Sequence, residues 1–287
     1  MKSIKDQTNL QGKNIILRLD LNVPLENSKI TDTTRIDKIL PTIKFLLNQN
    51  SKIIILSHVG RPKGKIIKEL SLKPIGEEIE KKLKEKVRLI SVNIGNINKK
   101  FISNTRENIL LLENIRYYPQ EEQNDQKFGE HLASLGDIYV NDAFSCSHRA
   151  HSSICEISKF LPAFSGLQLN LEVGALKKIT SNITKPITCI IGGSKISTKI
   201  NIIKNLIPKF DNLIIVGGMA NNIIEYSGNK IGKSIKEENV KEIISEIFRL
   251  SKEENCNIIY PMDVVVAESL DGSPQNKELY EIDNDEM

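Results

Sequence analysis

Arginine is the scarce cation in this sequence, and four arginines stand where they could bind an anion. The chain has eight arginines among its 40 basic residues. Arg61, Arg116 and Arg149 each follow a short apolar run, and Arg35 opens a segment with helical periodicity. A guanidinium stays charged and binds phosphate or carboxylate through two parallel hydrogen bonds, a geometry that lysine lacks. Any one loop arginine alone is more simply read as a solvated or loop-holding side chain. Four of them with His58 favour a single anion-binding crevice.

The segment around Arg149 also carries groups that bind transition metals. His148 and His151 flank Arg149, and Asp142 and Cys146 lie close by in the sequence. These side chains are typical zinc ligands, but their spacing fits no common zinc pattern, and an arginine between two histidines would repel a cation. We therefore expect an anion-binding loop in which one or both histidines are structural.

A diglycine turn in the second half of the chain suggests a site for a phosphate chain. A strand-like run leads into Gly192 and Gly193, which are followed by Lys195 and Lys199. Glycines let the backbone approach a phosphate, and a helix N-terminus supplies free N–H groups. Residues four apart share a helix face, so both lysines are predicted on one face of a helix over residues 196–207. The turn matches neither a Walker A loop nor G-x-G-x-x-G, so a tight structural turn would explain the glycines nearly as well.

The elements that position these residues alternate between strand and helix. Apolar runs typical of buried strands occur at residues 14–19, 53–56, 109–112, 138–140, 187–191, 213–216 and 258–260. Helical periodicity is found at residues 35–47, 72–83, 127–135, 196–207 and 237–250. The alternation predicts an α/β architecture of parallel sheets covered by helices on both faces, with ligands beyond the carboxyl ends of the strands. Gly217 and Gly218 occupy such a strand end, where they would lie against a nucleotide base or simply turn the chain.

The length and one break in this pattern predict two domains. A chain of 287 residues exceeds a typical single domain. Residues 152–183 carry two helical stretches, 156–160 and 167–179, with no strand between them. We place the boundary there, with one domain over residues 1–165 and a second over residues 166–287.

Composition excludes several classes of protein. The net charge is only +4 and the lysines are spread along the chain, so no nucleic-acid-binding surface is predicted. No apolar stretch approaches the roughly 20 residues that a membrane span needs, and the N-terminus lacks the apolar core of a signal peptide. We expect a cytoplasmic protein whose four cysteines are free thiols.

Taken in order, these segments resemble the phosphoglycerate kinase family over essentially the whole chain. The first half carries the signature R-x-D-x-N-V-P at residues 18–24. Further family-like segments are Thr34-Arg35-Ile36, Ser57-His58-Val59-Gly60-Arg61-Pro62-Lys63-Gly64, Glu113-Asn114-Ile115-Arg116, Asn141-Asp142-Ala143-Phe144, His148-Arg149-Ala150-His151, Gly192-Gly193-Ser194-Lys195-Ile196-Ser197-Thr198-Lys199 and Gly217-Gly218-Met219-Ala220. Several motifs of this length in one order are not expected by chance.

The resemblance implies two Rossmann-like lobes with parallel sheets, and phosphoryl transfer between 1,3-bisphosphoglycerate and ADP that gives 3-phosphoglycerate and ATP. The first lobe would bind 3-phosphoglycerate through Asp20, Asn22, Arg35, His58, Val59, Gly60, Arg61, Arg116 and Arg149. The second would bind the nucleotide, with its Mg²⁺, through Gly192, Gly193, Lys195, Lys199, Gly217 and Gly218. Arg35, Lys195 and Lys199 would be catalytic, because they hold or neutralise the phosphoryl groups. The resemblance also implies a cytoplasmic monomer.

The resemblance stops before the family's second lobe is complete. Residues 260–267 still match, but the chain ends at Met287, before the segment that in the family carries a metal-holding aspartate. We therefore predict no metal ligand in this chain and an incomplete second lobe, with an exposed sheet edge and uncovered apolar surface. The alternative to an active kinase is a fragment that binds 3-phosphoglycerate without kinase activity. An NAD-dependent dehydrogenase is disfavoured, since no G-x-G-x-x-G follows the first strand.

Overall fold

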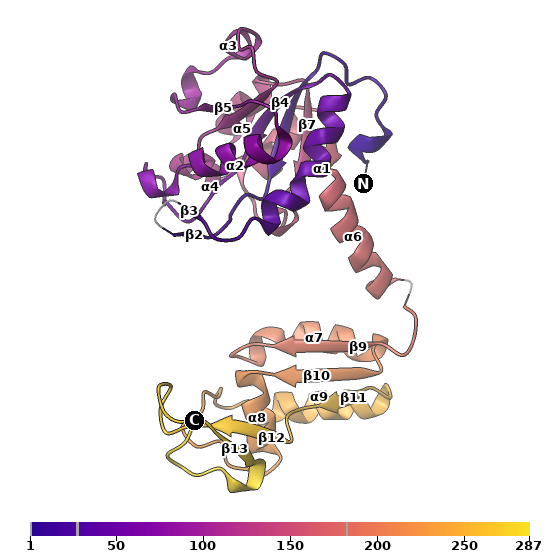
Figure 1. Cartoon of the computed structure of the whole chain (residues 1–287). Coiled ribbons are helices and arrows are strands. Elements are labelled where there is room, and N and C mark those ends of the chain that lie inside the picture. The colour runs from indigo at the N-terminus through magenta and orange to yellow at the C-terminus, as the bar shows by residue number, and fades with distance from the viewer. Residues whose placement is uncertain (1, 27–28, 182) are drawn as a thin grey trace. The chain divides into compact units, whose positions relative to one another are not determined.

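A computed structural model of the chain describes residues 2–26, 29–181 and 183–287. The chain divides into two units, Met1–Leu176 and Lys177–Met287, of which the second is the smaller. Each unit is an α/β structure built on a parallel sheet, which confirms the predicted fold class (Figure 1).

The division between the units falls within helix α6 (Leu167–Thr180), whereas the sequence analysis places the boundary just before this helix. The start of α6 belongs to the first unit because it is hydrogen-bonded there. Leu169 N donates to Asp142 Oδ1 at 2.8 Å, and Asn170 Nδ2 donates to Ser3 Oγ at 2.8 Å. The aspartate therefore caps the helix start from the end of a strand, and burial raises the pKa of its carboxyl group.

Six strands form the sheet of the first unit. In chain order they are β1 (Asn14–Leu19), β4 (Lys52–Leu56), β5 (Val87–Ile90), β6 (Ile109–Leu112), β7 (Ile138–Asp142) and β8 (Ala163–Ser165). Their order across the sheet is β5-β6-β4-β1-β7-β8, and every neighbouring pair is parallel. In β1, Arg18 lies beside Leu56 of β4 and beside Asn141 of β7. The carboxyl ends of the strands therefore meet along one edge of the sheet.

Helices cover both faces of this sheet because its central strands are apolar on both sides. They are α1 (Thr34–Asn48), α2 (Lys73–Leu83), α3 (Lys99–Ser103), α4 (Pro119–Glu122) and α5 (Gln126–Ser134), with the start of α6. Ile15 and Leu17 of β1 pack in one cluster with α1 and α2. Ile16, which points the opposite way, packs in a second cluster with α3 and α5 (Figure 1). Successive strand residues thus serve the two faces in turn.

Several short strands escaped prediction. No strand is predicted within residues 152–183, but β8 pairs with β7 there, and Ser165 N donates to Lys2 O at 2.9 Å. β5 was also missed, because Arg88 interrupts its apolar run, as was the antiparallel pair β2 (Leu25–Glu26) and β3 (Lys29–Ile30). Strands of two to four residues form because a neighbouring strand offers partners, which a local pattern does not reveal.

The second unit has a three-stranded parallel sheet and a separate hairpin. Its strands are β9 (Thr188–Gly192), β10 (Asn212–Val216) and β11 (Asn257–Ile259), in the order β11-β10-β9. Its helices are α7 (Ile200–Leu206), α8 (Gly218–Tyr226) and α9 (Lys241–Glu253), and β12 (Asp263–Val266) pairs antiparallel with β13 (Gln275–Glu278). Leu213 and Ile215 of β10 are fully buried among apolar residues of all three helices.

The opposite face of this small sheet is open. Ile214 of β10 lies in register between Ile190 of β9 and Ile259 of β11, which are 67% and 43% exposed. Helix coverage of both faces is therefore confirmed for the first unit and wrong for the second, within the part of the chain that the structure describes. In that part, none of the helices combines the length and the apolar character needed to cross a membrane.

Two helical glycines give a matched test of the packing of the first unit. A Cβ atom on Gly129 of α5 would lie 2.4 Å from the Cβ atom of Glu156, whereas one on Gly174 of α6 would meet nothing within 4 Å. Gly129→Ala is expected to lower the free energy of unfolding by about 1–3 kcal/mol through overpacking. Gly174→Ala should be neutral or should stabilise the helix by up to about 1 kcal/mol. Urea midpoints followed by circular dichroism measure both, and equal effects would contradict this packing.

Candidate functional site

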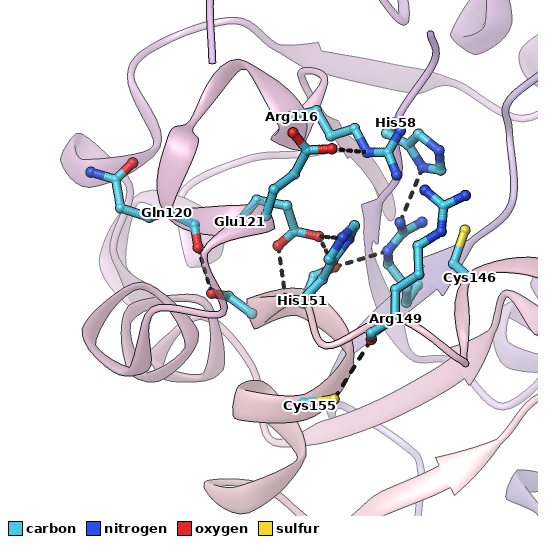
Figure 2. A network of polar contacts seen from close by, with 12 residues as sticks. His58, Arg116, Gln120, Glu121, Cys146, Arg149, His151 and Cys155 are labelled. Atoms are coloured by element: carbon cyan, nitrogen blue, oxygen red, sulfur yellow. Dashed lines mark hydrogen bonds and ion pairs between the residues drawn. The ribbon is translucent and has the colours of Figure 1, made fainter. Parts of the chain in front are cut away.

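The carboxyl edge of the first sheet gathers most of the residues that the sequence singled out. Asp20 follows β1, His58 follows β4, Arg116 lies in a single turn after β6, and Arg149 lies in the loop after β7. Figure 2 shows the side chains of Arg116 and Arg149 pointing toward His58. Parallel strands bring these four loops together although they are far apart in the sequence.

His58 is a buried and neutral imidazole among positive charges. It is 3% exposed, and its Nδ1 lies 3.1 Å from Nη2 of Arg18, a fully buried residue of β1. Burial, followed by the charges of Arg18, Arg116 and Arg149, lowers the pKa of His58 to about 2. At neutral pH the ring therefore adds hydrogen-bonding capacity to the cluster without adding charge.

Arg116 has hydrogen-bond donors to spare. Its side chain is 3% exposed, and Nη1 donates to the carbonyl oxygen of Gly60 at 3.1 Å. Nε lies 3.4 Å from Oε1 of Glu122 without the geometry of a hydrogen bond, and neither Nε nor Nη2 has a hydrogen-bond partner among the described residues. Buried donors are normally paired, so this guanidinium is ready for an added anion.

A second group of residues ties the neighbouring loops together. Arg35 Nη1 lies 2.7 Å from each carboxylate oxygen of Asp20, which also accepts from Ser145 Oγ at 2.6 Å. Asn22 Oδ1 accepts from Gly60 N at 2.8 Å. Gly60 has a φ of +64°, a conformation that favours glycine over other residues at this position.

The remaining two predicted residues differ in their surroundings. Val59 is 2% exposed and packs in the core, so only its backbone can serve a ligand. Arg61 is exposed and has no hydrogen bond or ion pair with any residue that the structure describes. The structure therefore does not bring Arg61 into the buried cluster around His58.

In the second unit the two diglycine turns pack against each other. Gly193 O accepts from Met219 N at 2.9 Å, and a Cβ atom on Gly218 would lie 3.2 Å from the Cα atom of Ser194. Gly217 has a φ of +68°. Gly218 thus favours the close approach of two backbones and Gly217 a left-handed turn, so these glycines also have a structural role.

A pocket of about 520 Å³ opens beside these turns. Its lining includes Gly193 and Gly218 of the turns together with Ala220, Ile224, Ile235 and Leu270. Such small and apolar walls suit a flat, weakly polar group such as a nucleotide base.

The two lysines do not share a helix face as predicted. The helix expected over residues 196–207 begins as a 3₁₀ turn, Ser197–Lys199, and α7 starts only at Ile200. Lys195 is exposed and precedes both. Lys199 lies over the first diglycine turn, since its Cε is 4.0 Å from where a Cβ atom of Gly193 would stand. The prediction failed because the tight turn delays regular α-helical hydrogen bonding.

Comparison with known proteins shows the family to which this chain belongs. The family model described as phosphoglycerate kinase matches residues 4–287. This chain belongs to the phosphoglycerate kinase family. It is 44% identical over 269 residues to the phosphoglycerate kinase of Wolbachia pipientis subsp. Culex pipiens, covering 93% of this chain and 68% of that protein. It is 42% identical over 277 residues to that of Chelativorans sp., covering 96% and 70%.

A solved structure agrees with this result. The phosphoglycerate kinase from Coxiella burnetii superposes with a TM-score of 0.83 at 36% identity, covering 99% of this chain and 72% of that protein. The chain thus spans roughly seven tenths of the length of these phosphoglycerate kinases.

Sequence reasoning missed residues that support the site in both units. Arg18 was noted only as a letter of a family signature, although a charged residue inside an apolar strand was a signal in itself. Glu237 gave no local signal, yet its Oε2 accepts from Ser197 N at 3.0 Å and its Oε1 accepts from Ser197 Oγ. Asn222 holds Glu237 in place through Nδ2, which donates to Glu237 O at 2.7 Å. The carboxylate thus fixes the turn that carries both lysines.

Burial of His151 should make the stability of the first unit depend on pH. His151 is 8% exposed, and burial and then Arg116 lower its pKa to about 4. Between about pH 4 and pH 6.5 only the unfolded chain binds this proton, so the free energy of unfolding falls as the pH falls, by up to about 1.4 kcal/mol per pH unit. His151→Gln should flatten this part of the profile. Urea unfolding at a series of pH values tests this, and parallel profiles for the two proteins would disprove it.

The carboxylate of Glu237 offers a second test with a matched control. Hydrogen bonds from Ser197 lower the pKa of Glu237, so its charged form is the one that holds the turn. Glu237→Gln should destabilise the second unit by about 1 kcal/mol and speed amide hydrogen exchange at residues 194–200. Glu238→Gln removes the same charge from a neighbouring side chain that is 73% exposed, and should change neither. Similar exchange rates in both variants would show that Glu237 does not support the turn.

Proposed function

We propose that this chain is a phosphoglycerate kinase in activity as well as in family. It would transfer a phosphoryl group reversibly between 1,3-bisphosphoglycerate and ADP, giving 3-phosphoglycerate and ATP, as a step of glycolysis. The observation that carries the proposal is the buried guanidinium of Arg116, which points toward His58 (Figure 2) and has two N–H groups without a hydrogen-bond partner among the described residues. Its cytoplasmic location and monomeric state stay predictions.

The first unit would bind the acid substrate by charge and by shape. Guanidinium groups at a sheet edge bind phosphate and carboxylate oxygens in pairs, and low solvent access strengthens each contact. Arg116 and Arg149 would hold one anionic end of 3-phosphoglycerate, with His58 as a neutral donor. Asp20 and Asn22, at the end of β1, would accept from or donate to the hydroxyl and carboxyl groups near the reacting end.

The second unit would bind the nucleotide across its two diglycine turns. The base would enter the pocket lined by Ala220, Ile224 and Ile235. Lys199, which lies over Gly193, would reach the phosphates, and Lys195 would offer a second charge from the same turn. Gly192, Gly217 and Gly218 would allow the backbone to lie close to the ligand.

The transfer itself needs positioning and charge, and no covalent enzyme intermediate. Charge develops on the oxygens of the transferred group, and fixed cations stabilise it without reorganisation. Arg35 and Lys195 would stabilise that negative charge. The side chain of Arg35 is 46% exposed and is held by Asp20. Because the two ligand sites belong to different units, the reaction needs both ligands bound at the same time.

Magnesium enters the proposal only as the ion that the nucleotide phosphates carry. Within the described ranges, no three or more His, Cys, Asp or Glu side chains are grouped so that they could hold a metal ion. Mg²⁺ commonly retains waters and binds substrate phosphates with few protein ligands, which is compatible with this site. The described residues therefore do not by themselves form a magnesium cage.

One observation favours a narrower function for the chain. The open sheet face of the second unit leaves Ile190 and Ile259 exposed to solvent, which weakens the unit that would bind the nucleotide. The alternative is a protein that binds 3-phosphoglycerate without turning it over.

Calorimetry separates the two functions. The purified protein would be titrated with 3-phosphoglycerate and with Mg-ATP, and turnover would be followed in a coupled assay. Binding of both ligands with turnover is the expected result. Binding of 3-phosphoglycerate alone would support the narrower function, and binding of neither would overturn both.

Arg35 and Arg88 form a matched pair for testing the transfer step. Both side chains are 46% exposed and each pairs with an acidic residue, but Arg88 lies on β5 beside Glu107, away from the site residues. Arg35→Lys keeps the charge and loses the planar fork, so kcat should fall by roughly tenfold to a hundredfold. Arg88→Lys should leave kcat and KM unchanged. Equal rates for wild type and Arg35→Lys would remove Arg35 from the mechanism.

A further inference from the structure

Behind His58 lies a chain of buried groups with no place in the transfer described above. Glu121, Ser153 and Arg18 are each 0% exposed. Glu121 Oε1 accepts from Ser153 Oγ at 2.6 Å, and Glu121 Oε2 accepts from Ser153 N at 2.9 Å. Ser153 Oγ also accepts from Arg18 Nε at 3.0 Å, and Arg18 Nη2 lies 3.1 Å from His58 Nδ1. One carboxylate is thus connected through two side chains to the imidazole of the anion site.

The direction of each hydrogen bond in this chain follows from its donors. A guanidinium has only N–H donors, so His58 Nδ1 must be the acceptor and the ring hydrogen must sit on Nε2. Ser153 Oγ accepts from Arg18, so its own hydrogen is directed to Glu121. The guanidinium of Arg18 therefore sets the position of the hydrogen on His58, and the carboxylate of Glu121 holds that guanidinium in place through Ser153.

We propose that Glu121 is a positioning residue of the phosphoglycerate site, which acts through Ser153 and Arg18 to fix His58 as a neutral imidazole that offers Nε2–H to the ligand. The identity of that ligand rests on the proposed function, whereas the state of His58 does not. Ser153 is itself anchored, because its carbonyl oxygen accepts from Tyr139 Oη at 2.7 Å. This chain of hydrogen bonds from Glu121 through Ser153 and Arg18 to His58, called the relay below, is therefore held in a fixed geometry.

The buried positive charge of Arg18 explains why a carboxylate, that of Glu121, lies at the end of this chain of hydrogen bonds. Arg18 is a buried cation, and removing the partner of a buried ion leaves a charge that nothing compensates. His58 cannot supply that compensation, because its own neighbours are cations or another histidine. They are Arg18 on β1, Arg116 in the turn after β6, and Arg149 and His151 in the loop after β7. Glu121 faces Arg18 and Arg116, and its Oε1 lies 3.7 Å from His151 Nδ1 (Figure 2). Burial raises the pKa of Glu121, so acidification should break the relay from this end.

Nitrogen NMR on the ligand-free protein tests the state of His58 without any mutation. The ¹⁵N shifts of Nδ1 and Nε2 distinguish the two neutral tautomers from each other and from the imidazolium. His58 should show the Nε2–H tautomer and should not titrate between about pH 5 and pH 8, the range in which an ordinary histidine changes charge. A protonated Nδ1 at neutral pH would overturn the proposal.

Variants then test whether Glu121 is the origin of this order. Glu121→Gln replaces one acceptor by a donor, so Arg18 should loosen and His58 should populate both tautomers. The affinity for 3-phosphoglycerate should fall about tenfold, the value of one charge-assisted hydrogen bond. Glu130→Gln removes the same charge from an exposed position of α5 and should change neither the tautomer nor the affinity. An unchanged His58 spectrum in Glu121→Gln would refute the relay.

Ser153→Ala keeps the buried charges and removes only the link, so it remains informative if Glu121→Gln does not fold. It should shift the His58 tautomers in the same way. In the double variant the two losses of affinity should be far from additive, because both break one chain. Additive losses would show that Glu121 acts by another route. If the wild-type protein fails to bind 3-phosphoglycerate but shows the ordered His58, the proposed function falls and the relay stands.

Discussion

Repulsion among buried guanidinium groups is the interaction around which the first unit is organised. Arg18 and Arg116 are buried, and their charges, together with that of Arg149, lower the pKa of the same imidazole, His58. Such a cluster persists only where rigid elements hold each cation and where neutral or negative groups separate them. The parallel sheet supplies the rigidity, because Arg18 lies in a strand, and Arg116 and Arg149 lie in segments that follow strands. The neutral His58 and the carboxylate of Glu121 supply the separation, and unpaired donors remain for an anion.

The site of the second unit depends on the packing of two glycine turns and not on buried guanidinium groups. The site is formed where the backbones of two turns lie close together, an approach that glycine favours because it has no side chain. Its positive charge comes from Lys195 and Lys199, and the carboxylate of Glu237 holds the turn next to them. Because three helices cover only one face of the small sheet, this unit has fewer buried contacts to hold its site rigid than the first unit has.

Periodicity and composition predicted the parts of the fold that are long and regular. β1 and β6 have the predicted bounds, and α1 and α6 differ from prediction by a residue or two at their ends. Those elements are specified by their own apolar pattern. β5 and β8 are short, and their pairing depends on neighbours, so no local signal announced them. The prediction that the helix over residues 196–207 presents Lys195 and Lys199 on one face was wrong for a related reason. The glycine turn and the hydrogen bond from Ser197 to Glu237 impose a 3₁₀ start on this helix.

The candidate site shows the same limit at the level of side chains. Residues that would touch a ligand follow strands and carry recognisable chemistry, so Arg116 and His58 were found from sequence. The groups that hold them were not, since Arg18 and Ser153 are 135 residues apart and Glu121 and Ser153 are 32 apart. Nothing in a serine or a glutamate alone indicates such a partner. Only burial distinguishes Glu121 from the exposed Glu122 beside it, and burial is a property of the folded chain. A sequence motif therefore identifies the residues that contact the ligand. The tautomer of His58 depends on the buried residues behind it, and only the geometry of the folded chain shows where its hydrogen lies.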